Sequence, residues 1–219
     1  ASDDWNGLTV ERILTWTTTD GEVTITDCNE AATGELVIPD TIEGNPVTSI
    51  GDYAFYECTS LTSITIGNGV TSIGQAAFAS CLSLTMIEVG AGNLNYTGIN
   101  GVLFNKEKTV LLTYPAGKTG DNYTIPDGVT SIGEWAFELC TSLTSITIGN
   151  GVTSIGQAAF ASCLSLTSIT IPDGVTSIRK TAFYNCTSLT SITIPDGVTS
   201  IGESAFEFCI NLTSITIPD

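Results

Sequence analysis

The most reactive side chains in this sequence are seven cysteines, and six of them follow a fixed spacing of 23 residues within two runs. The first run is Cys58 and Cys81, and the second is Cys140, Cys163, Cys186 and Cys209. Thiolates act as nucleophiles and metal ligands, and paired thiols form disulfides. The chain has no histidine, so it offers neither a Cys–His catalytic pair nor a His-ligated metal site.

Each of these six cysteines stands three residues after a phenylalanine, in the sequence A-F-x-x-C. The fold needs a small apolar group at this recurring position, and free cysteine packs as one. We therefore expect a ladder of buried free thiols, joined by Cys28, and not a set of disulfides. We expect no enzyme activity, no metal and no cofactor.

A second set of polar side chains consists of Ser-x-Thr pairs, in which both hydroxyls lie on one face of a strand. The pairs are Ser63/Thr65, Ser145/Thr147, Ser168/Thr170, Ser191/Thr193 and Ser214/Thr216, and Met86 and Glu88 interrupt the series. Three interpretations remain open. The pairs could form a binding surface for protein or glycan, an ice-binding array, or a sheet face that Ser and Thr make soluble and β-prone.

Aspartates recur in turns, at Asp40 and in the P-D-G sequences of Asp127, Asp173 and Asp196. Turn chemistry explains them, because Pro presets φ, Asp tolerates the turn and Gly supplies a positive φ. Neighbouring coils about 5 Å apart would make facing carboxylates repel by ~1 kcal/mol in water. A Ca²⁺ ion bridging Asp127, Asp173 and Asp196 is the minority interpretation.

The copies of the repeat differ most around the A-F pair, where several variable positions carry aromatic side chains. These are Tyr53, Tyr56, Trp135, Tyr184 and Phe208. Aromatics at exposed positions are typical of interfaces, so these residues join the four Ser-x-Thr pairs between Ser145 and Thr216 as the candidate binding surface. Drift at unconstrained positions gives the same pattern and is the alternative.

The elements that position these side chains follow from one repeated unit, I-P-D-G-V-T-S-I-G-x-x-A-F-x-x-C-x-S-L-T-S-I-T. The alternation in L-T-S-I-T-I predicts a strand, and the three-residue spacing in A-F-x-x-C predicts a short helical turn. The glycine after V-T-S-I marks a second corner. Arg179 replaces it in one copy, which indicates that this corner does not require a positive φ. Such coils cannot bury their apolar side alone, so they must stack.

The pairing of L-T-S-I-T-I-P with V-T-S-I-G-x-x-A-F-x-x-C resembles the BspA-like (Treponema-type) leucine-rich repeat, over residues 36–219. The resemblance implies a β-rich α/β solenoid, right-handed, with a parallel sheet on its concave side and short helical turns on its convex side. It also implies a secreted or cell-surface protein that binds components of host or neighbouring cells.

Two regions depart from the regular array. Residues 1–35 predict an N-terminal capping hairpin around Asp20-Gly21, with Trp5 and Trp16 covering the open end of the core. Within the array of residues 36–219, the long unit 89–124 predicts a β-hairpin. Its strands are expected at 101–104 and 109–114, joined by a polar turn at 105–108.

The last strand precedes Asp219 and has no visible cap. This predicts either a truncated array or self-association through an unpaired strand edge.

The formal net charge is −17, with only six Lys and Arg residues. Phosphate binding needs clustered basic residues, so we expect no nucleic-acid partner, and no apolar run approaches the length of a membrane span. The sequence therefore predicts a non-enzymatic extracellular binding or adhesion module for protein or glycan partners. A structural, self-assembling or ice-binding role is the alternative.

Overall fold

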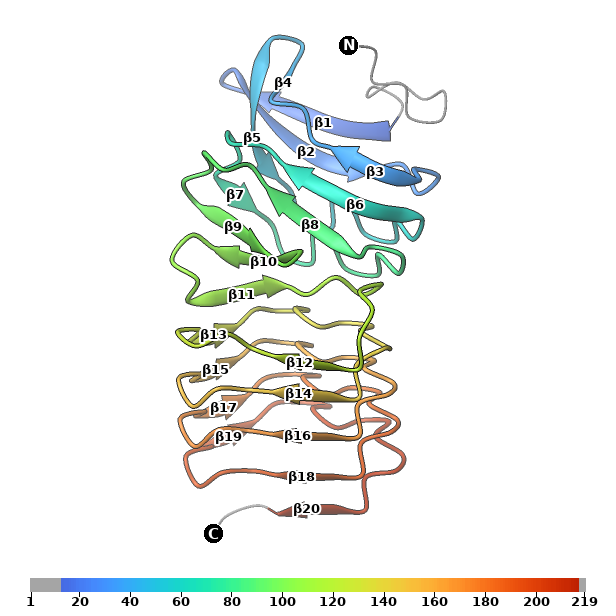
Figure 1. Ribbon diagram of the computed structural model, residues 1–219, viewed down its shortest axis with the longest axis vertical. Helices are drawn as coiled ribbons and strands as arrows, with labels where there is room; N and C mark the ends of the chain where they lie inside the picture. The colour runs from blue at the N-terminus through green and yellow to red at the C-terminus, as the bar shows by residue number, and fades with distance from the viewer. Residues whose placement is uncertain (1–12, 217–219) are drawn as a thin grey trace. The chain divides into compact units, whose positions relative to one another are not determined.

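The computed structural model describes residues 13–216, which belong to two compact units, Ala1–Lys106 and Glu107–Asp219. In both units the chain winds as a β-solenoid, and successive coils add strands to parallel sheets (Figure 1). Within residues 14–216 the regular structure consists of strands and turns, with no helix. The predicted solenoid of stacked coils is thus confirmed, whereas its hand and the concavity of its sheet stay predictions.

Unit Ala1–Lys106 begins with an antiparallel hairpin of β1 (Leu14–Thr19) and β2 (Glu22–Cys28). Asp20 and Gly21 have φ of 53° and 81°, as a two-residue hairpin turn of type I′ requires. Trp16 is half-buried on β1, and Trp5 lies outside the described residues. The hairpin is present, while its role as a cap stays a prediction.

Two sets of parallel strands follow in the same unit. The first set continues the sheet that contains β2, and the second set forms a separate sheet. The first contains β5 (Asn45–Ile50) and β7 (Ser72–Ile73), with β4 (Thr41–Ile42) folded antiparallel onto β5. The second contains β3 (Gly34–Val37), β6 (Leu61–Ile66) and β8 (Met86–Val89).

Unit Glu107–Asp219 is the most regular part of the molecule, and each coil contributes one strand to each of two sheets (Figure 1). The S-I-T sheet contains β12 (Asn122–Thr124), β14 (Ser145–Thr147), β16 (Ser168–Thr170), β18 (Ser191–Thr193) and β20 (Ser214–Thr216). The second sheet contains β11 (Val110–Thr113), β13 (Ser131–Ile132), β15 (Ser154–Ile155), β17 (Ser177–Ile178) and β19 (Ser200–Ile201). The sequence predicts only the first sheet, because the short V-T-S-I segment shows too little alternation to indicate a strand.

The core of this unit is a column of aromatic rings, one from each coil. Phe160 is fully buried between Phe137, at 5.2 Å between ring centroids, and Phe183, at 5.1 Å, with the rings stacked. Tyr114 continues the column at 5.3 Å from Phe137. Tyr114 precedes Phe137 by the repeat spacing of 23 residues, so spacing alone could have found it.

Burial in this unit depends on having a coil on both sides. Ile178 lies between two coils and is 1% exposed, whereas its counterpart Ile201 has a described coil on one side only and is 41% exposed. Burying such a side chain stabilises the fold by about 1.5–3 kcal/mol. The hydrophobic core therefore forms between coils and not within one.

The short helical turn expected for A-F-x-x-C is not confirmed, because the segment forms a series of turns in which alternate backbone N–H groups donate to the next coil. The backbone N–H groups of Trp135, Phe137 and Leu139 donate to Gln157, Ala159 and Ala161 of that coil, at 2.7–2.9 Å. Trp135 and Leu139 have φ of 59° and 56°, in the left-handed region. Such residues interrupt a right-handed helix at a cost of roughly 1–2 kcal/mol each, which the bonds between coils offset.

The corner glycines also differ in part from expectation. Gly128 has the expected positive φ of 92°, but Gly174 and Gly197 do not adopt a positive φ. At Gly197 and at Gly156 of the second corner, an added Cβ would lie 2.6 Å from backbone atoms of the preceding coil. The close approach of neighbouring coils, and not backbone conformation, therefore requires glycine at these two positions.

The long unit contains a hairpin that begins one strand earlier than predicted. β9 (Tyr96–Ile99) pairs antiparallel with β10 (Val102–Asn105) around Asn100 and Gly101, whose φ values are 51° and 80°. The two predicted strands are present as β10 and β11, but β9 was missed. Its sequence Y-T-G-I contains a glycine, which strand propensity disfavours.

Candidate functional site

The S-I-T sheet of unit Glu107–Asp219 places the predicted hydroxyls in two straight columns. Each coil is in one-to-one register with the next, so that Ser168 faces Ser191 and Thr170 faces Thr193. Neighbouring strands lie about 4.8 Å apart, which sets the spacing within a column. Ser145 is half-buried, and the other members are exposed: Thr147, Ser168, Thr170, Ser191, Thr193, Ser214 and Thr216.

The structure separates these hydroxyls from a second, structural set of threonines. Thr167 and Thr190 precede the S-I-T segment, and their hydroxyls donate to the backbone carbonyls of Thr144 and Thr167, at 3.1 and 3.3 Å. Among the described residues, no hydrogen bond to another protein group is found for the hydroxyls of Thr170 and Thr193. The structural set holds neighbouring coils together, while the S-I-T hydroxyls are available to solvent or a ligand. The sequence pattern alone does not separate the two sets.

The aspartates of the P-D-G corners are exposed, and two of them border the hydroxyl columns. Asp173 and Asp196 line a groove of about 480 Å³ together with Thr170, Thr193 and Thr216. Among residues 13–216, no group of three or more His, Cys, Asp or Glu side chains is arranged to hold a metal ion. The minority interpretation of a Ca²⁺ site at Asp127, Asp173 and Asp196 therefore gains no support.

The aromatic candidates lie along the A-F-x-x-C turns. Tyr53 and Tyr56 contact each other edge to face at 5.9 Å, and Tyr184 contacts Phe208 in the same way at 5.3 Å. Phe208 is 53% exposed. Sequence drift explains a single exposed ring, but Trp135 and Tyr184 line the same cavity.

That cavity, called here the aromatic slot, has a volume of about 220 Å³ and lies across three coils. Trp135 and Glu138 come from one coil, and Thr181 and Tyr184 come from the coil after next. The intervening coil supplies the floor, with Ala158, Ala161 and Ser162. The slot exists because the middle coil carries small side chains at positions where its neighbours carry Trp, Tyr and Glu. Sequence alignment of the copies could have found it, had the small residues been considered together with the large ones.

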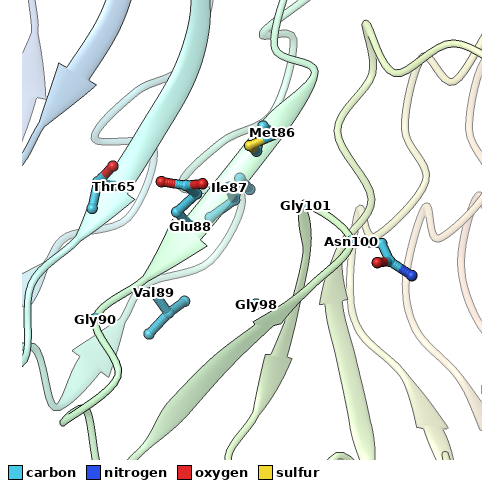
Figure 2. Close-up of a pocket in the computed structure, with 9 residues that line it drawn as sticks. All are labelled: Thr65, Met86, Ile87, Glu88, Val89, Gly90, Gly98, Asn100 and Gly101. Carbon is cyan, nitrogen blue, oxygen red and sulfur yellow. The ribbon is translucent and has the colours of Figure 1, made fainter.

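A separate groove of about 540 Å³ marks the interruption of the hydroxyl series in unit Ala1–Lys106. Glu88 of β8 lies beside Thr65 of β6, Met86 lies two residues earlier on β8, and Asn100 and Gly101 at the hairpin turn also line the groove (Figure 2). Thr65 and Glu88 are register partners on the two strands. The break predicted from the sequence is therefore a change of surface chemistry, from hydroxyls to a thioether and a carboxylate.

The thiol ladder is confirmed, since all seven cysteines are free and buried. The thiols of Cys163 and Cys186 each donate to the carbonyl of the phenylalanine in the preceding coil, at 3.1 Å. Burial raises the pKa of Cys163 to about 12 and holds the pKa of Cys140 well above its usual value. These thiols are protonated packing groups at neutral pH and not nucleophiles.

Comparison with known proteins agrees with this geometry. The family model of the BspA type leucine rich repeat region matches residues 32–112 and 116–219, in six copies. The chain therefore belongs to the BspA-type leucine-rich-repeat family. No curated protein matches the chain.

Solved structures of similar proteins come from several bacteria. A leucine rich cell surface protein from Faecalibacterium prausnitzii is 31% identical, with a TM-score of 0.64 over 84% of this chain. This chain spans 59% of that protein. The T. pallidum leucine-rich-repeat protein is 26% identical, with a TM-score of 0.54 over 94% of this chain and 91% of its own. The pneumococcal vaccine antigen PcpA, at 19% identity, a TM-score of 0.64 and 94% and 80% coverage, shares the fold.

The raised pKa of the buried thiols predicts a loss of stability at alkaline pH. The pKa of Cys163 rises from 9.0 to about 12 on folding, so the folded chain retains a proton that the unfolded chain releases. Stability is therefore unaffected below pH 9 and falls as the pH rises from 9 towards 12. We expect the melting temperature of the native chain to fall across this range by more than that of a Cys163→Ala variant. Equal losses in both proteins, or rapid thiol labelling at pH 8 without denaturant, would contradict this assignment.

Proposed function

We propose that the chain is a non-enzymatic binding module that presents the S-I-T face of unit Glu107–Asp219 to a protein or glycan at a cell surface. The observation that carries this proposal is the pair of exposed hydroxyl columns, whose members hold one register from coil to coil. A regular array of donors and acceptors suits an extended partner with repeating polar groups. Because many weak contacts act together, such a surface binds without a deep pocket.

Family membership and charge support the same proposal. The family has a relative described as a leucine rich cell surface protein, at 31% identity. The net charge of −17 disfavours a nucleic-acid partner. Within residues 13–216, no helix is long and apolar enough to cross a membrane. The description of that relative is what supports a place outside the cell or on its surface for this chain.

The test separates the available hydroxyls from the structural ones. A Thr170→Val, Thr193→Val double variant removes two exposed hydroxyls with little change of shape, and we expect about tenfold weaker binding or more. The matched control, Thr167→Val with Thr190→Val, removes two hydroxyls that bond to the backbone. It should lose about 1–3 kcal/mol of unfolding free energy while retaining its affinity.

Binding is measured by biolayer interferometry against purified extracellular-matrix proteins and an array of bacterial and host glycans. The proposal fails if the native chain binds no member of either panel. It also fails if the Thr170, Thr193 variant binds as the native chain does.

Ice is a second candidate partner, favoured by the two-dimensional order of the same face. Within a strand the Ser and Thr hydroxyls are separated by about 6.6 Å, and between strands by about 4.8 Å, over several coils. If ice is the partner, the native chain inhibits ice recrystallisation at micromolar concentration and a Thr170→Lys, Thr193→Lys variant does not. If ice crystals grow as fast with the native chain as in buffer alone, ice is excluded as a partner.

A further inference from the structure

We propose that the aromatic slot binds an arginine side chain of a protein partner. The proposal rests on the binding function above, because such a slot has a use only in a protein that engages a partner. It adds the chemistry of one contact point, on the A-F-x-x-C side of the coil and separate from the hydroxyl columns.

The dimensions of the slot suit one flat group. Trp135 with Glu138 and Thr181 with Tyr184 lie on coils two strand spacings apart, which is about 9.6 Å. The volume of about 220 Å³ is smaller than that of a pocket for a drug-sized ligand, and it suits a single side chain. The floor of Ala158 and Ala161 is apolar, as the methylene stem of a long side chain requires.

The charge of the slot selects a cation. Glu138 supplies a carboxylate, and Trp135 and Tyr184 supply aromatic rings whose faces attract positive charge. Two basic residues, Arg179 and Lys180, precede Thr181 in the chain. The ammonium of Lys180 is paired with Glu203 of the next coil at 2.8 Å, and Arg179 lines a different groove.

Arginine fits better than lysine for reasons of geometry. Its guanidinium is planar, stacks on aromatic faces and pairs with a carboxylate through two parallel hydrogen bonds. Lysine carries a compact, strongly hydrated charge that gains less from a flat slot. The indole N–H of Trp135 is buried without a hydrogen-bond partner. No hydrogen bond from this group therefore holds the ring in a position that would block a ligand.

The duplicated sequence provides a matched control for occlusion of the slot. Residues Cys58 to Thr85 are identical to residues Cys140 to Thr167, so Ala79 and Ala161 are equivalent positions in identical segments. Other coils carry Tyr or Glu at this position, so the fold accepts a large side chain there. Ala161→Tyr fills the slot, whereas Ala79→Tyr places the same ring in unit Ala1–Lys106.

The experiment is a titration of the full chain with the peptide acetyl-Gly-Gly-Arg-Gly-Gly-amide. The reporter is the Trp135 indole N–H resonance in a ¹⁵N–¹H spectrum, assigned with a Trp135→Phe variant. Peptides with citrulline or lysine in place of arginine provide the charge and shape controls. We expect a saturable shift with arginine and, with citrulline, at least about tenfold weaker binding.

The variants should rank in a defined order. Glu138→Gln keeps the shape of the slot and should weaken arginine binding about tenfold, whereas Glu207→Gln at the equivalent position of a later coil should not. Ala161→Tyr should abolish the shift, and Ala79→Tyr should preserve it. The proposal is overturned if the arginine peptide leaves Trp135 unchanged, if citrulline or lysine binds equally well, or if Glu138→Gln has no effect. Because the probe is a peptide, these outcomes are independent of whether the hydroxyl columns bind a surface partner.

Discussion

Each coil of this protein depends on its neighbour for backbone hydrogen bonds that it cannot make itself. The A-F-x-x-C turn shows this dependence most clearly, since Trp135, Phe137 and Leu139 all donate to the next coil. Two of these three residues have a left-handed backbone, which is unfavourable for side chains other than glycine. An isolated coil would carry this conformational cost without the compensating bonds. The column of Phe rings follows the same rule, because Phe160 and Phe183 are fully buried between two other rings, whereas Phe206 at the end of the column is half-buried.

This dependence explains where the surface can carry function. Positions that contact the neighbouring coil are fixed in type: phenylalanine, cysteine, isoleucine, and glycine where coils approach closely. Positions that point away are free to differ, and there the aromatic and charged residues of the slot are found. The hydroxyl columns are an intermediate case, since strand propensity and solubility already favour Ser and Thr. Their outward hydroxyls nevertheless leave hydrogen-bonding capacity for a partner.

Much of the fold was predictable from the sequence because the repeat is regular. The spacing of Phe55, Phe78 and their counterparts identified the stacked coils, and the cysteine positions identified the buried thiols. The helical turn is not confirmed because a three-residue spacing fits both a helical turn and a series of non-helical turns bonded to the next coil. The second sheet was missed because its strands, such as Ser154–Ile155, are only two residues long.

The candidate site was less predictable. The columns of Ser168, Thr170 and their counterparts followed from strand alternation. The distinction between Thr167 and Thr170 needed hydrogen-bond geometry that no sequence pattern contains. The aromatic slot required knowledge of which coils are neighbours and of how small Ala158 and Ala161 are beside Trp135 and Tyr184.

The central claim is that coil-to-coil packing holds the molecule together, and the most direct test is the unfolding free energy of a Phe160→Ala variant. Urea denaturation followed by circular dichroism gives this quantity. The ring is fully buried between two others, so its removal should cost about 3–5 kcal/mol. Phe208→Ala, at an exposed position, should cost less than about 1 kcal/mol. Equal losses in the two variants would contradict the account.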